Sequence, residues 1–185
     1  MAQGHERKYL SLMSVLEKFK SIRTFVFDVD GVMTDGSVQV FDTGEQVRRM
    51  STRDGYSLQL AIKKGYRVII LSGASSEGVR LRLQYLGIRD IFLNVQDKVD
   101  VLRQFVRAHH LDEQDMLYMG DDIPDYAAMQ YVGLGCSPSD AAPEIRHIAA
   151  YISSYGGGQG CVRDVIEKVL KLNGHWELDT SLASK

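Results

Sequence analysis

An apolar run that ends in two aspartates constrains the fold of this chain more than any other feature. Residues 24–27 are typical of a buried strand, and Asp28 and Asp30 follow directly, before Gly31. Aspartate is disfavoured inside strands, so the pair predicts a site at the carboxyl edge of a parallel sheet, where α/β proteins bind ligands. A polar turn with an aspartate cap is the alternative. The spacing D-x-D-G-x-x-T-D-G favours the site.

The rest of the chain alternates predicted strands and helices. Expected strands cover residues 24–27, 67–71, 91–93, 116–119, 133–136 and 150–152, and expected helices cover residues 9–18, 54–64, 76–86, 98–109, 125–132 and 161–172. Residues 37–41 and 46–50 predict a hairpin around a short glycine-containing turn. This order predicts an α/β fold: a doubly wound, Rossmann-like parallel sheet with helices on both faces, a β-hairpin insertion after the first strand and no cap domain.

The pattern predicts one domain with short flanking segments. Residues 1–20 are expected to form an N-terminal extension with a helix, and residues 174–185 a flexible tail. The domain itself is expected over residues 21–173, with the hairpin at 37–50, a glycine-rich segment at 156–164 and a final helix at 161–172.

Composition excludes several classes of partner. The net charge of −2 gives no reason to expect nucleic acid. No apolar run approaches the roughly 20 residues that span a bilayer, and the first 20 residues lack the apolar stretch of a secretion signal. Cys136 and Cys161 are the only cysteines of the 185 residues, which favours free thiols and a cytoplasmic location.

Four polar positions follow four predicted strands: the Asp28/Asp30 pair, Ser72, Lys98 and the Asp121/Asp122 pair. Taken singly, a residue at each of these positions is at least as often a helix cap, a turn residue or a solvated side chain as an active-site residue. Strand ends in a doubly wound sheet converge on one crevice, so the set together predicts a single site.

Phosphoryl transfer is the chemistry that needs this set of side chains. Asp28 can attack phosphorus, and Asp28 and Asp121 suit a hard cation such as Mg²⁺. Asp30, two residues along, would lie on the same side as Asp28 if the local chain stays extended, where it could protonate the leaving oxygen and then activate water. Ser72 and Lys98 can donate hydrogen bonds to the transferring group.

These residues resemble, in order, the four motifs of the haloacid dehalogenase superfamily of phosphohydrolases. The resemblance implies that Asp28 is the nucleophile and Asp30 the acid and base, with the Asp30 backbone carbonyl on Mg²⁺. It implies that Asp121 completes the metal ligands and that Ser72 and Lys98 hold the phosphoryl group. Asp122 and Asp125 are expected to support their loop.

Within the superfamily, the chain resembles the capless branch of 3-deoxy-D-manno-octulosonate 8-phosphate phosphatases over about residues 21–173. The supporting segments are residues 28–36, the hairpin, Thr52-Arg-Asp-Gly-Tyr56 and Gly157-Gly-Gln-Gly-Cys-Val-Arg-Asp164. The resemblance implies a Mg²⁺-dependent enzyme of lipopolysaccharide precursor synthesis. It also implies a homotetramer in which a neighbour's hairpin and tail complete each site. On this basis, deletion from Gly157 onward is expected to impair turnover more than folding.

The resemblance also implies a sugar-binding set. Its members are Asp30, Ser51, Thr52, Arg53, Asp54, Gly55, Arg82 and Lys98. Ala74 and Gln59 stand where octulosonate phosphatases often carry arginine, so a nine-carbon keto-deoxy sugar acid 9-phosphate is the alternative substrate.

The motifs leave three alternative functions to consider. Mutases and phosphotransferases share the chemistry but usually need a cap that excludes water. A non-catalytic module that assists a nucleotidyl-sugar synthetase would carry a similar domain, although every motif residue is intact here. A response-regulator receiver has its acidic pair before the phosphorylated aspartate, which the D-x-D-G hairpin argues against.

Overall fold

Six parallel strands form the central sheet of the structure, a computed structural model that describes residues 15–177 and 179–182. Their order is β5–β4–β1–β6–β7–β8, with every pair parallel. The strands are β1 (Thr24–Phe27), β4 (Arg67–Leu71), β5 (Asp90–Phe92), β6 (Met116–Met119), β7 (Leu134–Ser137) and β8 (Tyr151–Ile152). The chain builds outward from β1 through β4 and β5, then returns to β6 on the other side of β1. This switch of direction places a crevice at the end of β1.

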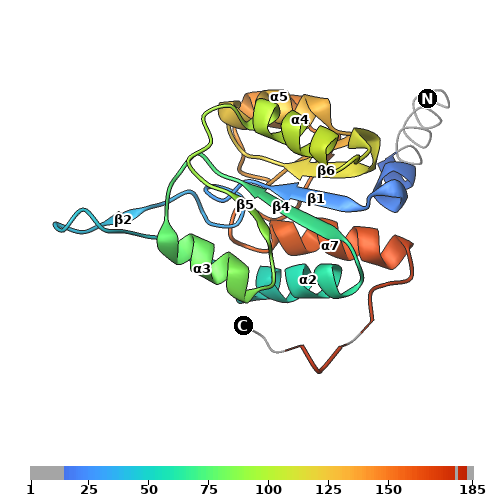
Figure 1. Cartoon of the computed structure of the whole chain (residues 1–185), viewed down its shortest axis with the longest axis horizontal. Coiled ribbons are helices and arrows are strands. Elements are labelled where there is room, and N and C mark those ends of the chain that lie inside the picture. The colour runs from blue at the N-terminus through green and yellow to red at the C-terminus, as the bar shows by residue number, and fades with distance from the viewer. Residues whose placement is uncertain (1–14, 178, 183–185) are drawn as a thin grey trace, which may run out of the picture.

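Helices cover both faces of the sheet (Figure 1). One layer holds α2 (Thr52–Lys63), α3 (Glu77–Tyr85) and α7 (Cys161–Leu172), and the other holds α4 (Lys98–Ala108), α5 (Tyr126–Tyr131) and α6 (Pro143–Ile148). The predicted fold class is therefore confirmed. The sequence pattern missed α6 and two 3₁₀ turns, η1 (Glu113–Asp115) and η2 (Ile123–Asp125), which are six, three and three residues long.

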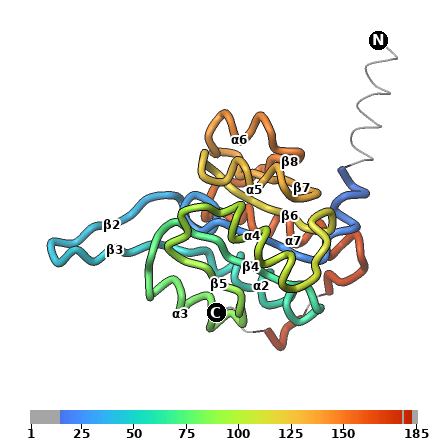
Figure 2. Tube along the Cα trace, turned by 45° about the horizontal axis from the view of Figure 1, so that its top comes forward, coloured from blue at the N-terminus to red at the C-terminus, as the bar shows by residue number. Residues whose placement is uncertain are grey.

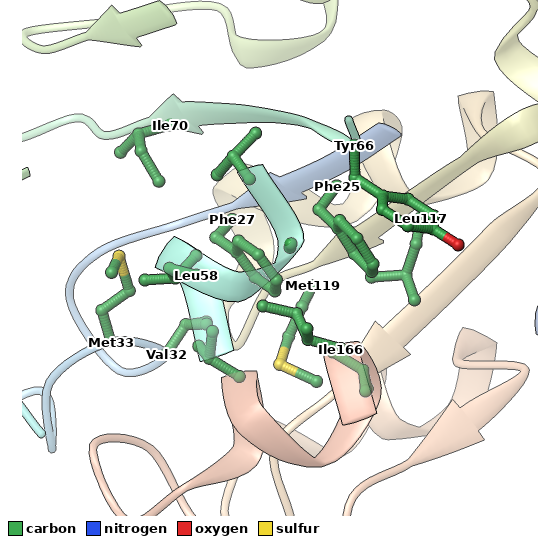
Figure 3. Close-up of a cluster of buried hydrophobic side chains, with 14 of the residues drawn as sticks. Phe25, Phe27, Val32, Met33, Leu58, Tyr66, Ile70, Leu117, Met119 and Ile166 are labelled. Carbon is green, nitrogen blue, oxygen red and sulfur yellow. The ribbon is translucent and has the colours of Figure 1, made fainter. Parts of the chain in front are cut away.

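Side chains of β1 alternate between two cores, one under each helix layer. Phe25 and Phe27 pack in the cluster shown in Figure 3, together with Leu58 of α2 and Ile166 of α7. Val26 points to the opposite face and packs in the second cluster. The period of two that a strand requires thus buries β1 completely and fixes where its carboxyl end emerges.

The hairpin extends from the body of the protein (Figures 1 and 2). Its strands, β2 (Gln39–Val40) and β3 (Gln46–Val47), pair antiparallel and are shorter than predicted. Every residue of both strands is exposed, including Val40 at 65%. The hairpin therefore has almost no core of its own.

Apolar side chains on both sides of the predicted domain, residues 21–173, join its core. Phe19, in the helical segment 15–21, is 1% exposed, and its ring meets Tyr151 edge-on. The other part of the expected N-terminal helix lies outside the described residues. At the C-terminal end, Trp176 and Leu182 pack against the core, and Asp179 accepts a hydrogen bond from Lys63 of α2 at 2.5 Å. The described part of the expected flexible tail is thus packed on α2.

Helix α7 is part of the core, so deletion from Gly157 onward would remove core structure together with the glycine-rich segment. Six of its residues, from Cys161 to Leu170, are buried against the first cluster. Gly157 itself lies against the backbone of the β1 loop, where a Cβ would overlap the Gly31 carbonyl. Removing this segment would expose the α2 face, which makes the deletion a test of folding.

Two further observations concern the cysteines and the lengths of the helices. Cys136 and Cys161 are both free and buried. Among the described residues, no helix is both long and apolar enough to cross a membrane.

Candidate active site

The polar residues that follow the central strands line one cavity of about 460 Å³. Asp28 and Asp30 follow β1, Ser72 follows β4, Lys98 begins α4, and Asp121 and Asp125 lie beyond β6; all of them line the cavity. The structure thus brings together side chains that are up to 97 residues apart (28 to 125).

Lys98 is held between two buried carboxylates. Its Nζ lies 3.0 Å from Oδ2 of Asp28 and 2.7 Å from Oδ1 of Asp125. The three side chains are 5%, 9% and 1% exposed, so solvent screens these pairs little. The ammonium group is therefore fixed beside Asp28.

Asp125 organises more of the site than the sequence analysis assigned to it. Its Oδ1 also accepts a hydrogen bond from the Tyr118 hydroxyl at 2.6 Å, and its Oδ2 accepts one from the Asp121 backbone N–H at 3.1 Å. The four-residue spacing of Asp121 and Asp125 is the sequence feature that could have indicated the contact between them. Nothing in the sequence singled out Tyr118, which looked like an ordinary buried strand residue.

Burial and crowding of the carboxylates raise their pKa values. Desolvation raises the pKa of Asp28 to about 7, with Asp125 adding to the rise and Lys98 opposing it. Desolvation, followed by the charge of Asp125, raises the pKa of Asp121 to about 7. Like charges confined in this way favour a divalent cation that would neutralise them.

Three aspartates fit such a cation. One carboxylate oxygen from each of Asp28, Asp121 and Asp125 can lie within 4.8 Å of the others. Gly31 makes room for Asp121, because a Cβ there would overlap its carboxylate, and its φ of +83° suits glycine. An all-oxygen donor set favours Mg²⁺ or a similar hard ion. Asp28 and Asp121 were expected to bind the metal through their side chains and Asp30 through its backbone carbonyl; Asp125 is the third carboxylate of the cluster.

Asp30 faces the same cavity but is held differently. Its two carboxylate oxygens accept hydrogen bonds from Arg48, at 2.6 Å from Nε and 3.2 Å from Nη2. The Asp30 side chain stays 30% exposed. Sequence reasoning missed Arg48, because its partner lies 18 residues away and its neighbours on the hairpin are exposed.

Ser72 and Asp122 keep local roles beside the cavity. Ser72 is 2% exposed, and its Oγ accepts a hydrogen bond from the Ala74 N–H at 3.3 Å. Asp122 accepts from the Ile123 N–H at 2.8 Å and begins η2, as expected of a residue that supports its loop.

The expected sugar-binding residues do not share one cavity. Arg82 lines a space of about 810 Å³ between the hairpin and α3, and Ser51 and Arg53 line another of about 390 Å³. Thr52 lines both. A narrow gap is lined by Asp30, Arg48, Ser72 and Ser76. It adjoins the 460 Å³ cavity, which Asp30 and Ser72 also line, and the 810 Å³ space, which Arg48 and Ser76 also line.

Asp54, which the resemblance places in the sugar-binding set, makes a buried contact between two helices. It is 2% exposed, and its Oδ1 accepts a hydrogen bond from the Arg163 N–H at 2.8 Å, which joins the starts of α2 and α7. Its Oδ2 is buried without a partner among the described residues. Gly55, next in the chain, is buried in α2 as well.

We expect Asp54→Asn to change stability with pH. Burial raises the Asp54 pKa to about 6, from an ordinary value of 3.8. The unfolded chain therefore releases this proton at lower pH than the native protein, so the wild type loses stability as pH rises from 4 to 6. Asparagine keeps the Oδ1 acceptor without the charge, so the variant should gain about 1–3 kcal/mol over wild type above pH 6 and little at pH 4. Urea unfolding at both pH values measures this difference. A difference that is the same at both would contradict it.

No family model matches the chain, but individual proteins do. It is 31% identical over 160 residues to 3-deoxy-D-manno-octulosonate 8-phosphate phosphatase KdsC of Escherichia coli strain K12, covering 86% of this chain and 85% of the relative.

Solved structures match the fold at similar identity. The phosphatase of the same name from Yersinia pestis superposes with a TM-score of 0.85 at 30% identity, covering 88% of each chain. The one from Moraxella catarrhalis, in complex with magnesium ion, phosphate ion and KDO, gives 0.83 at 32% identity, covering 85% of this chain and 91% of the other. A Legionella pneumophila structure named for the HAD superfamily (subfamily III A) of hydrolases gives 0.88 at 30% identity, covering 91% and 92%.

Proposed function

Because the chain belongs to the 3-deoxy-D-manno-octulosonate 8-phosphate phosphatase family of the haloacid dehalogenase (HAD) superfamily, we propose that it removes the phosphate of 3-deoxy-D-manno-octulosonate 8-phosphate. The observation that carries the proposal is the cluster of buried Asp28, Lys98 and Asp125 with half-buried Asp121 at the switch point of the sheet. A carboxylate nucleophile, a fixed cation and a metal-binding set are what hydrolysis of a phosphate monoester needs.

The geometry supports a two-step reaction. In the first step, Asp28 attacks phosphorus, the bond to the sugar oxygen breaks, and Asp30 gives that oxygen a proton. In the second step, water attacks phosphorus, Asp30 takes a proton from the water, and the bond between Asp28 and phosphorus breaks. The Val29 N–H donates to Oδ1 of Asp28 at 2.7 Å and Lys98 lies at Oδ2, so the nucleophile is oriented before substrate arrives.

Lys98 and Ser72 would hold the oxygens of the transferring group, where negative charge develops. Asp28, Asp121 and Asp125 would hold the metal ion, with the Asp30 backbone carbonyl as the expected further ligand. When bound, Mg²⁺ would supply positive charge to phosphate oxygens. The magnesium and phosphate ions in the Moraxella catarrhalis relative support this choice of metal.

Exposure of Asp30 favours hydrolysis over transfer to another acceptor. Enzymes that transfer the phosphoryl group usually exclude water from the intermediate. Here Asp30 is 30% exposed on an open cavity, so water can reach it. The intact Asp28 and Lys98 likewise favour an enzyme over a non-catalytic module.

Association through the hairpin is a further part of the proposal. Val38, Val40, Phe41 and Val47 are between 37% and 65% exposed. Burying such a patch against other copies of the chain would stabilise an assembly. A homotetramer in the cytoplasm is what we propose from the family resemblance.

We expect metal-dependent phosphate release with a clear preference for the eight-carbon acid. The assay compares octulosonate 8-phosphate, a nine-carbon keto-deoxy acid 9-phosphate and hexose phosphates, each with Mg²⁺ and with EDTA. EDTA should lower the rate at least about 100-fold, because the carboxylates alone would repel the phosphate. Preference for the nine-carbon acid would move the protein to that alternative substrate. Equal rates on all substrates would keep the chemistry and contradict the proposed specificity.

A further inference from the structure

Arg48 reaches from the end of the hairpin to the active-site loop and binds both oxygens of Asp30. Nε donates to Oδ1 at 2.6 Å and Nη2 donates to Oδ2 at 3.2 Å. Two parallel hydrogen bonds from a planar guanidinium fix the plane of a carboxylate as well as its place. A lysine or a single hydrogen bond would leave that plane free to rotate.

Burial distinguishes Arg48 from the rest of the hairpin. Its side chain is 5% exposed, whereas Gln46 and Val47 immediately before it are exposed, and the next residue, Arg49, has a side chain that is 90% exposed. An arginine buried in this way contributes little net stability, because desolvation offsets the attraction to its partner. Anchoring of the hairpin alone is therefore a weak explanation for the pair.

The site has room for a substrate beside this pair. Each Asp30 oxygen keeps a lone pair after accepting from Arg48, and Asp30 lines the active-site cavity. Arg48 also lines the 810 Å³ space between the hairpin and α3. Its Nη1 is buried and has no hydrogen-bond partner among the described residues. A donor left in this state is satisfied by water or by a ligand oxygen.

We propose that Arg48 is a positioning residue for Asp30, an inference that rests on the phosphatase function proposed above. Arg48 holds the Asp30 carboxyl group in the orientation that delivers a proton to the leaving oxygen. The hairpin thereby becomes part of the catalytic apparatus, because movement of β3 would move Arg48 and so turn Asp30.

Leaving-group chemistry separates this role from a structural one. The oxygen of a sugar phosphate leaves poorly without a proton, whereas p-nitrophenolate leaves readily without one. The ratio kcat/KM reports on steps up to departure of the leaving group, so it isolates the first proton transfer. Arg48→Gln should lower kcat/KM for octulosonate 8-phosphate about 10- to 100-fold and for p-nitrophenyl phosphate less than about threefold. Arg48→Lys should recover part of the loss, since an ammonium can make one of the two hydrogen bonds.

Arg146→Gln is the matched control. It removes the same charge from an exposed position of α6, outside the hairpin. This variant should retain the wild-type kcat/KM for both substrates.

A double-mutant cycle provides the second readout. If Arg48 acts through Asp30, adding Arg48→Gln to an Asp30→Asn enzyme should cost less than about threefold on the sugar phosphate. Full additivity, or equal losses on both substrates with Arg48→Gln, would overturn the inference; if that variant does not fold, Arg48→Lys decides by the same ratio. Absence of phosphate release by the wild type from either substrate would instead refute the proposed function.

Discussion

Asp28→Asn abolishes turnover of octulosonate 8-phosphate, by at least about 10⁴-fold in kcat, if Asp28 is the nucleophile. The asparagine amide cannot attack phosphorus to form the acyl phosphate. The variant should nevertheless fold, because an amide oxygen can still accept the Val29 N–H that binds Oδ1. It also removes a buried carboxylate whose pKa is raised to about 7, chiefly by desolvation. Steady-state phosphate release with Mg²⁺ measures the effect.

Asp112→Asn is the control for this substitution, because Asp112 lies exposed at the start of η1, before β6 and so at the opposite end of that strand from the site, and asparagine also serves as a helix cap. It should keep the wild-type rate, and thermal unfolding should show that both variants are folded. A rate for Asp28→Asn within about tenfold of wild type would assign the nucleophile elsewhere.

Lys98→Met should have the largest effect on stability. Methionine has a similar length but no charge, so it leaves Asp28 and Asp125 buried without their shared cation. Breaking a buried ion pair from one side costs about 3–5 kcal/mol. The cost should be greatest near pH 8 and smaller near pH 6, because the raised pKa of Asp28 lets that carboxyl group bind a proton there. Turnover should fall about 10²–10³-fold as a donor to the transferring group is lost.

Urea unfolding at both pH values tests this prediction, and Lys171→Met is its matched control. Lys171 pairs with Glu167 on the surface of α7, and its side chain is 59% exposed. Loss of such a pair should change the free energy of unfolding by less than about 1 kcal/mol. A Lys98→Met protein as stable as the Lys171→Met protein would show that the buried cluster does not depend on Lys98.

The positions of the strands and of the main site residues could be predicted because both follow local rules. Apolar runs such as β4, ended by glycine or serine, mark buried strands. In a doubly wound sheet, the carboxyl ends of such strands converge. That rule alone placed Asp28, Ser72, Lys98 and Asp121 at one cavity.

Contacts between distant segments could not be predicted from these rules. Asp54 was expected in a substrate-binding segment. Its partner, the Arg163 N–H, could not be recognised from the sequence because it lies 109 residues away. Arg48 looked like one more charge on an exposed hairpin until the fold placed Asp30 beside it. Asp125 was expected only to support its loop, and the packing of α4 against η2 brings it to Lys98. In each case the residue type was visible and the partner was not.

Trapping the phosphorylated enzyme tests the central claim most directly. Wild-type protein is quenched in acid during turnover of octulosonate 8-phosphate with Mg²⁺, and its peptides are then analysed by mass spectrometry. The account predicts a phosphate, labile in base, on the peptide that contains Asp28, and none in the Asp28→Asn protein. Reduction of the acyl phosphate with borohydride should convert Asp28 to homoserine and so identify the residue. Continued phosphate release with no modified aspartate, or with the phosphate on a different residue, would contradict the account.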